Sequence, residues 1–204
     1  MKKVFITSAF IIILVNAFAQ NNNEGAGFKK ENIFIGGSLN LGLATGYFAI
    51  GGTPEIGYSF NEWLDGGLAF NINYTSQKSF SLYNDVIGKY SAFNYGAGAF
   101  FRVYPIQNFF LQGQLENNFI TYKSSDYFSG LTGKNTVNAT SFLAGIGYGQ
   151  RQIGQGSFYT VILIDLLTDP NSPYRLTSYS GASSTVIPII RGGFNFYLSP
   201  KKKK

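Results

Sequence analysis

Apolar residues alternate with polar or small residues along eight segments of this chain, and this alternation limits the possible folds more than any other feature. Successive side chains of a β-strand point to opposite faces, so a repeat of two predicts a strand with one apolar and one polar face. The segments are residues 33–43, 48–60, 64–74, 93–103, 109–119, 141–149, 159–167 and 186–198. We therefore predict an all-β fold built from eight strands.

The first 19 residues have the three parts of a secretory signal peptide. Lys2 and Lys3 give a basic start, residues 4–18 are apolar, and Ala17 and Ala19 form the small-residue cleavage pattern. The apolar run is shorter than the roughly 20 residues that a spanning helix needs, and an uncleaved anchor helix is the alternative. We expect the chain to comprise a signal peptide over 1–19, an N-terminal periplasmic segment over 20–31, a β-barrel over 32–198 and a basic tail over 199–204.

The formal net charge of +6 does not indicate a nucleic-acid surface. Six of the sixteen basic residues are Lys2, Lys3 and residues 201–204, so ten basic residues balance ten acidic ones in the rest of the chain. Binding to nucleic acid needs an excess of positive charge on one surface. We therefore expect no nucleic-acid partner.

Composition favours a membrane protein. Charged residues make up 13% of the chain, whereas soluble proteins average about 25%. Since lipid cannot satisfy open backbone groups, strands that cross a bilayer must close into a barrel. The chain is predicted to be an eight-stranded antiparallel up-and-down transmembrane β-barrel in the bacterial outer membrane, monomeric and surrounded by outer-membrane lipids.

The connections between segments alternate in length. Residues 61–63, 105–108 and 152–157 are short, whereas 76–89, 123–137 and 168–185 are long and polar. Short periplasmic turns and long extracellular loops are typical of outer-membrane barrels. The short connection over 44–47 is the exception.

The same alternation would also fit a soluble, lipocalin-like periplasmic binding barrel, which hides its apolar face. Two features favour the inverse arrangement. The polar face is rich in Gly, Ala and Ser, as a narrow lumen requires, and it lacks the Lys and Glu expected on a soluble surface. The apolar face ends in aromatic residues, which we interpret as interfacial aromatics: Phe60, Trp63, Tyr104, Phe109, Tyr148 and Phe158.

Seven charged residues within the predicted strands lie on the polar face, and we expect them to form a charge network in the lumen: Glu55, Asp65, Arg102, Glu116, Arg151, Asp165 and Arg191. A charge facing lipid at mid-membrane costs about 2 to 4 kcal/mol for Arg, which explains the sorting. We predict one ion pair between Arg191 and Asp165 and a second between Asp65 and Arg102. The network either fills and neutralises the lumen or acts as a gate for water or ions.

The last segment has a pattern that resembles the C-terminal assembly signal of bacterial outer-membrane barrels. Arg191 and Gly193 lie on its polar face, and Phe196 and Leu198 on its apolar face. The resemblance implies that the barrel assembly machinery is a partner.

Residues 56–63, 104–113 and 169–174 resemble a family of small outer-membrane β-barrel proteins with an OmpA-like transmembrane fold. The similarity extends over most of the exported chain, and its motifs mark turns and strand ends rather than a reaction. Some members carry the name 2-oxoglutarate decarboxylase, but that reaction needs a thiamine-diphosphate enzyme far larger than this single domain.

The residue types present argue against catalysis. The chain contains no His and no Cys, so it lacks the usual general base and any thiolate ligand for a metal. We expect no enzyme activity, no cofactor and no metal site. The predicted function is non-enzymatic, in envelope integrity or in recognition of an unknown surface ligand through the long loops. A narrow pore for small solutes or ions is the alternative.

Overall fold

The computed structural model describes residues 28–198 apart from 82, 84, 154 and 178–183. The predicted signal peptide and the predicted basic tail lie outside the described residues. The chain divides into two compact units, Met1–Lys30 and Glu31–Lys204, and the sheet belongs to the second. Among the described residues no helix is long and apolar enough to span a membrane.

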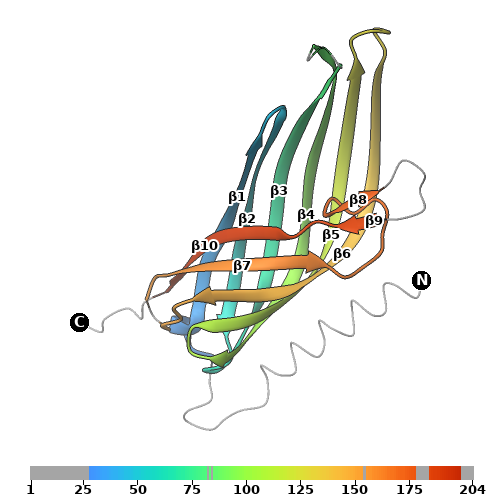
Figure 1. Ribbon diagram of the computed structural model, residues 1–204. Coiled ribbons are helices and arrows are strands. Elements are labelled where there is room, and N and C mark those ends of the chain that lie inside the picture. Colours follow the sequence, from blue (N-terminus) through green and yellow to red (C-terminus); the bar gives the residue numbers. More distant parts are fainter. Residues whose placement is uncertain (1–27, 82, 84, 154, 178–183, 199–204) are drawn as a thin grey trace, which may run out of the picture. The chain divides into compact units, whose positions relative to one another are not determined.

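Eight antiparallel strands form a closed barrel, which confirms the predicted fold (Figure 1). A short 3-10 helix, η1 (Lys30–Asn32), precedes the first strand. The barrel strands are β1 (Ile33–Ala44), β2 (Tyr47–Ser59), β3 (Leu64–Phe80), β4 (Val86–Ile106), β5 (Phe109–Asp126), β6 (Thr132–Gly149), β7 (Ser157–Asp165) and β10 (Ile189–Tyr197). Each strand pairs with its neighbours in sequence, apart from β8 (Arg175–Thr177) and β9 (Ser184–Val186), which form a separate two-stranded sheet. β10 closes the barrel against β1, through a register that runs from Phe34 opposite Tyr197 to Leu39 opposite Gly192.

The outer face of the barrel is apolar and the lumen is polar. Leu39, Ile72 and Ile146 are 70%, 54% and 61% exposed, whereas Glu55 and Arg102 are buried. This arrangement is the inverse of a soluble lipocalin-like barrel, whose apolar residues line the interior. The exposed aliphatic band therefore faces lipid.

The lumen is filled by side chains. Rings of Phe34, Phe100 and Tyr197 form one buried cluster near the short-turn end, and Phe110 and Tyr159 belong to another. Gly147 faces the Phe110 ring so closely that a Cβ atom at this position would occupy the place of the ring. An eight-stranded barrel has an interior just wide enough for such packing.

Four strands are much longer than the membrane requires, which corrects the prediction of long loops over 76–89 and 123–137. β3 and β4 continue to a short connection at residues 81–85, and β5 and β6 to one at 127–131. Crossing a bilayer takes about 9 to 11 residues per strand, whereas β4 has 21 and β7 has 9. The upper halves of β3 to β6 are polar on both faces, so their sequence resembles loops.

The long strands form a protruding sheet, by which we mean β3 to β6 beyond the level at which β7 and β10 end (Figure 1). β6 pairs with β7 only from Leu143 to Gly149. Before Leu143, β6 is paired along its whole length with β5 but with no other described strand. The protruding sheet thus ends in an open edge.

Candidate functional site

A buried ion pair lies at the centre of the lumen. Arg102 of β4 donates to both carboxylate oxygens of Glu55 on β2, at 2.9 and 2.8 Å. Its Nε donates to Gln112 at 2.9 Å, and the guanidinium lies 4.7 Å from the ring centre of Phe100 and 4.5 Å from that of Tyr159. Both charged side chains are almost fully buried. Arg102 of β4 therefore connects this strand to side chains of β2, β5 and β7.

A chain of amides connects this pair to the next acid. Gln112 donates to Gln114 at 3.0 Å, and Gln114 donates to Glu116 at 3.2 Å. Asn71 of β3 donates to the same Glu116 oxygen at 2.6 Å. The Glu116 carboxylate is thus held by amide donors of a connected polar network rather than by an ion pair.

A second ion pair closes the short-turn end. Arg151 donates to both oxygens of Asp65, at 2.6 and 3.2 Å, and also to the carbonyl groups of Asn61 and Glu62. Arg151 follows the end of β6 in the β6–β7 connection, so it is not a strand residue as predicted. It ties that connection to the β2–β3 turn across the barrel.

We expect Arg151→Ala to lower the free energy of unfolding by about 1.5 to 3 kcal/mol, because it removes charge-assisted hydrogen bonds and leaves buried Asp65 without its cation. Urea titration of the barrel in lipid vesicles measures this loss. Lys30→Ala, which removes an exposed charge that precedes β1, is the control and should leave the urea midpoint unchanged. An unchanged midpoint for Arg151→Ala would show that this end of the barrel does not depend on the pair.

The two predicted ion pairs are wrong, although their members do lie in the lumen. Asp65 and Arg102 are directly opposite in the register, but each binds a different partner. Arg191 lies opposite Val161 on β7, which places it about 13 Å along the strand from Asp165. Within the described chain, ion pairs below 4.0 Å join Arg102 to Glu55 and Arg151 to Asp65.

Arg191 and Asp165 both contact the segment between β7 and β10. Arg191 donates to the Tyr174 hydroxyl at 3.4 Å. Asp165 accepts from the Ser172 hydroxyl at 2.6 Å and from the backbone N–H groups of Phe142 and Leu167 at 3.1 and 3.0 Å. Ser172 and Tyr174 are buried, so the segment over residues 166–175 places these two side chains in the barrel, and we call this segment the plug.

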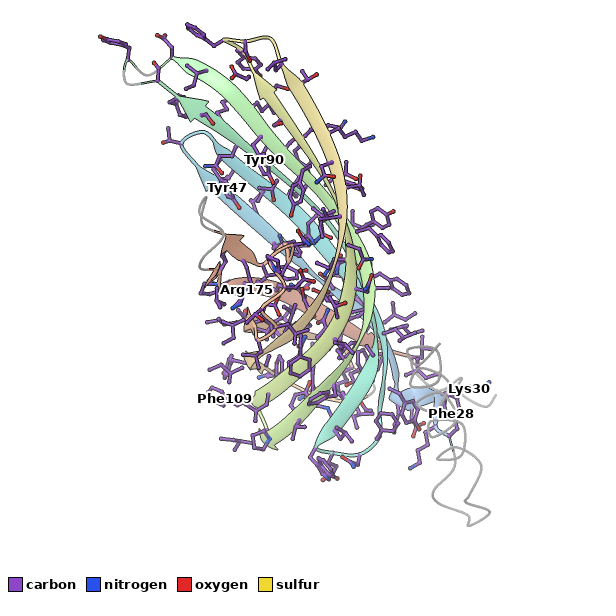
Figure 2. The ribbon with its side chains drawn as sticks, turned by 90° about the vertical axis from the view of Figure 1, so that its right-hand side faces the viewer. Phe28, Lys30, Tyr47, Tyr90, Phe109 and Arg175 are labelled. Carbon is purple, nitrogen blue, oxygen red and sulfur yellow. The ribbon has the colours of Figure 1, made fainter. Side chains whose placement is uncertain are left out.

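Above the plug lies a cavity of about 460 Å³. Its walls include Asn73, Asn94 and the stacked rings of Tyr90 and Tyr122, whose centres are 5.6 Å apart. Figure 2 labels Tyr90 on the long part of β4, far from Phe109 at the short-turn end. Asn94 is buried, and neither its amide oxygen nor its amide nitrogen has a partner among the described residues. These groups can hydrogen-bond water or a small polar solute.

Five of the six predicted interfacial aromatics are exposed on the outer face: Phe60, Trp63, Phe109, Tyr148 and Phe158. Tyr104 is the exception, because it is two residues from Arg102 and so shares the lumenal face. The centre of its ring lies 5.4 Å from the ring centre of buried Phe110, and the Arg151 guanidinium lies 4.7 Å from the Tyr104 ring centre.

The residues of the predicted assembly signal divide between the two faces. Phe196 and Leu198 are exposed on the outer side, and Arg191 is buried in the lumen. β10 ends at Tyr197, and the backbone N–H of Leu198 donates to the carbonyl of Ile33 at 2.9 Å. The assembly role of this segment stays a prediction.

Several lumen contacts of aromatic residues were not predicted, although the alternation had placed Tyr197 on the polar face of its segment. Tyr159 donates to Glu55 at 3.1 Å, and the Tyr197 hydroxyl lies 3.0 Å from that of Ser59. Their positions follow from the alternation of β7 and β10, so strand phase was the signal that could have found them. In the described part of the chain no group of three or more His, Cys, Asp or Glu residues could hold a metal ion.

Comparison with known proteins identifies similar folds and no close relative. No protein-family model and no curated protein matches the chain. Among solved structures, the chain is similar to Ail, the attachment invasion locus protein of Yersinia pestis, in complex with the heparin analogue sucrose octasulfate, at 16% identity and a TM-score of 0.45, over 80% of this chain and 96% of Ail. It is also similar to Neisserial surface protein A, at 11% identity and a TM-score of 0.41, over 81% and 95% of the two chains.

Proposed function

We propose that this chain is a non-enzymatic barrel of the bacterial outer membrane that recognises an extended segment of a protein partner at the cell surface. The observation that carries the proposal is the open edge of β6 on the protruding sheet. The barrel anchors this sheet, and the plugged lumen gives it a rigid base.

The outer-membrane location is supported by features of the chain itself. An apolar band surrounds a polar lumen, the short turns lie at one end, and the N-terminal residues have the pattern of an export signal. A closed barrel satisfies its backbone hydrogen bonds between its own strands, so its apolar exterior can be placed in a bilayer or a detergent micelle. The long hairpins then extend from the opposite face, away from the periplasm.

The edge of β6 offers backbone hydrogen bonds to a partner. Thr140 and Phe142 direct their N–H groups away from β5, toward Asp169 and Asp165. Since backbone direction alternates along a strand, Lys134, Thr136 and Asn138 also direct their peptide groups outward. No described strand lies beside them. An exposed edge of this kind can take up an added strand.

The test is photo-crosslinking on intact cells, with a photoreactive residue at position 138 and a second change at Thr136. Thr136→Pro removes the outward N–H and keeps the backbone hydrogen bonds to β5, so it should abolish the adduct with a surface partner. It also loses the hydroxyl contact with Thr121 of β5 at 3.2 Å, a loss that the control Thr136→Val shares. Thr136→Val keeps the N–H and should preserve the adduct. Heat-modifiable gel mobility confirms that all variants fold. An adduct that survives Thr136→Pro, or no adduct with the parent chain, would refute edge recognition.

A narrow pore is the second candidate, and the cavity above the plug favours it. The amide groups of Asn73 and Asn94 line this cavity with unpartnered polar atoms, which can hydrogen-bond water. Below it, Arg102, Phe110 and Leu143 are buried and occupy the lumen. Any conducting path therefore requires movement of the plug and of this layer.

A further inference from the structure

Four lysines form a row across the outer face of the protruding sheet. In the strand register Lys78 of β3 is opposite Lys89 of β4, and Lys123 of β5 is opposite Lys134 of β6. Lys89 is opposite Ser125 and Ser91 is opposite Lys123, so the two pairs are diagonal neighbours. All four side chains are exposed. The lysine row therefore crosses four adjacent strands at one level.

This arrangement is unfavourable unless an anion lies against it. Like charges directly opposite each other destabilise a strand pair. No carboxylate of the described chain lies within 4.0 Å of any of these four amines, since the two ion pairs that form are both in the lumen. The outward positions of β3 to β6 around the row are Ser, Thr, Asn or apolar residues. Within the described residues, none of the four lysines of the row thus has a direct ion-pair partner.

A hollow of about 340 Å³ lies at the centre of the row. Lys89 and Lys123 form its sides together with the hydroxyl residues Ser91, Thr121 and Ser125. Tyr74 and Phe93 line it at the end nearer to the membrane. Two ammonium groups and three hydroxyls around one hollow supply the donors that a phosphate group needs.

The level of the hollow matches the headgroups of the outer leaflet. The outward residues of β4 from Val103 to Phe93 are apolar, and this stretch spans about 33 Å of strand, or about 25 Å of height at a tilt near 40°. That height equals the apolar band of an outer-membrane barrel. Lys89 lies about 10 Å higher, and a flexible lysine side chain can reach down to the headgroup level.

We propose that the lysine row binds the phosphorylated headgroup of an outer-leaflet glycolipid, with one phosphate in the hollow between Lys89 and Lys123. The acyl chains of this lipid lie against the aromatic residues below, including Phe93 and Phe119, which are 45% and 43% exposed. A free anion could bind the lysines, but it would have no acyl chains to pack against this apolar surface. The phosphate site uses side chains of β4 and β5, whereas edge recognition uses backbone groups of β6. Lys134 belongs to both the row and the edge strand, but Lys89→Gln/Lys123→Gln leaves the β6 backbone unchanged.

The experiment measures binding of bis-phosphorylated lipid A to the full-length protein in phosphatidylcholine nanodiscs, beside dephosphorylated lipid A as the second ligand. The double variant Lys89→Gln/Lys123→Gln should bind this lipid about 10-fold or more weakly, because each lysine near an anionic lipid surface adds to the free energy of binding. The parent chain should bind the dephosphorylated lipid as weakly as the double variant binds the phosphorylated one. Lys89→Arg/Lys123→Arg keeps the charges and should retain binding.

Lys29→Gln/Lys30→Gln is the matched control, since it removes the same charge from residues that precede β1. It should bind like the parent chain. The proposal is overturned if this control loses as much affinity as the hollow variant, or if dephosphorylated lipid A binds the parent chain equally well. Displacement of the glycolipid by an equal concentration of inorganic phosphate would also overturn it, because the site would then belong to a free anion.

Discussion

Replacing Arg102 with methionine is expected to lower the free energy of unfolding by about 3 to 5 kcal/mol, the typical loss when one partner of a buried ion pair is removed. Glu55 would keep its charge in a lumen where it is only 5% exposed. Gln112 would lose the donor to its side-chain oxygen. The rings of Phe100 and Tyr159 would lose the cation between them. The effect is large because the same side chain serves β2, β4, β5 and β7.

Urea titration in lipid vesicles, followed by tryptophan fluorescence of Trp63 and by gel mobility, measures this loss. The double variant Arg102→Met/Glu55→Gln should recover a large part of the stability, since it leaves no unpaired charge. Lys30→Met, which changes an exposed site outside the barrel strands, should leave the urea midpoint unchanged. If Arg102→Met alone unfolded like the parent chain, the central position of this ion pair in the lumen would be disproved.

Asp165→Ala should release the plug, so that movement of the remaining layer of Arg102, Phe110 and Leu143 is enough to open a conducting path. Its carboxylate accepts the hydroxyl of Ser172 and two backbone N–H groups. Removing a charged acceptor from buried donors costs about 1.5 to 3 kcal/mol for each well-made bond that is not replaced. Ser172 would lose its shortest hydrogen bond, and Tyr174, whose N–H donates to Ser172 at 3.2 Å, would lose its anchor. The cavity above the plug would then continue further into the lumen.

Single-channel recording in planar bilayers tests this result. We expect rare openings for the parent chain and frequent openings for Asp165→Ala. Asp169→Ala is the matched control, because this half-buried aspartate of the same segment accepts from the backbone N–H groups of Thr140 and Asn171, at 3.3 and 2.9 Å, and not from Ser172 through its carboxylate. It should remain closed. Silent recordings from Asp165→Ala would leave the residue with a purely structural role and would weaken the pore as a second function.

Much of the fold was predictable because a strand repeats every two residues. The alternation of Phe194 and Phe196 with Asn195 and Tyr197 placed β10 correctly, and the same rule placed the lumenal acids. It failed at Tyr104, where aromatic character was given more weight than the shared phase with Arg102. It also failed at Lys89 and Lys123, because a strand that leaves the membrane is polar on both faces and looks like a loop.

The candidate sites were less predictable, for a physical reason that differs from one to the next. The lysine row depends on register, which brings together residues from four strands that local patterns cannot align. The open edge of β6 depends on the difference in length between β6 and β7. The plug depends on Ser172 and Tyr174 turning into the barrel, where Asp165 and Arg191 bind them.

The sequence alone determined that this chain forms a barrel with an apolar exterior and a charged lumen, since both follow from the local period of two and from the cost of exposing charge to lipid. Only the tertiary structure decided which charges meet. Arg102 binds Glu55 rather than Asp65, which is opposite it in the strand register, and Arg151 of the β6–β7 connection binds Asp65 instead. These distances are set by the closure of the sheet and by the stagger between its strands. Closure and stagger in turn depend on all eight strands together.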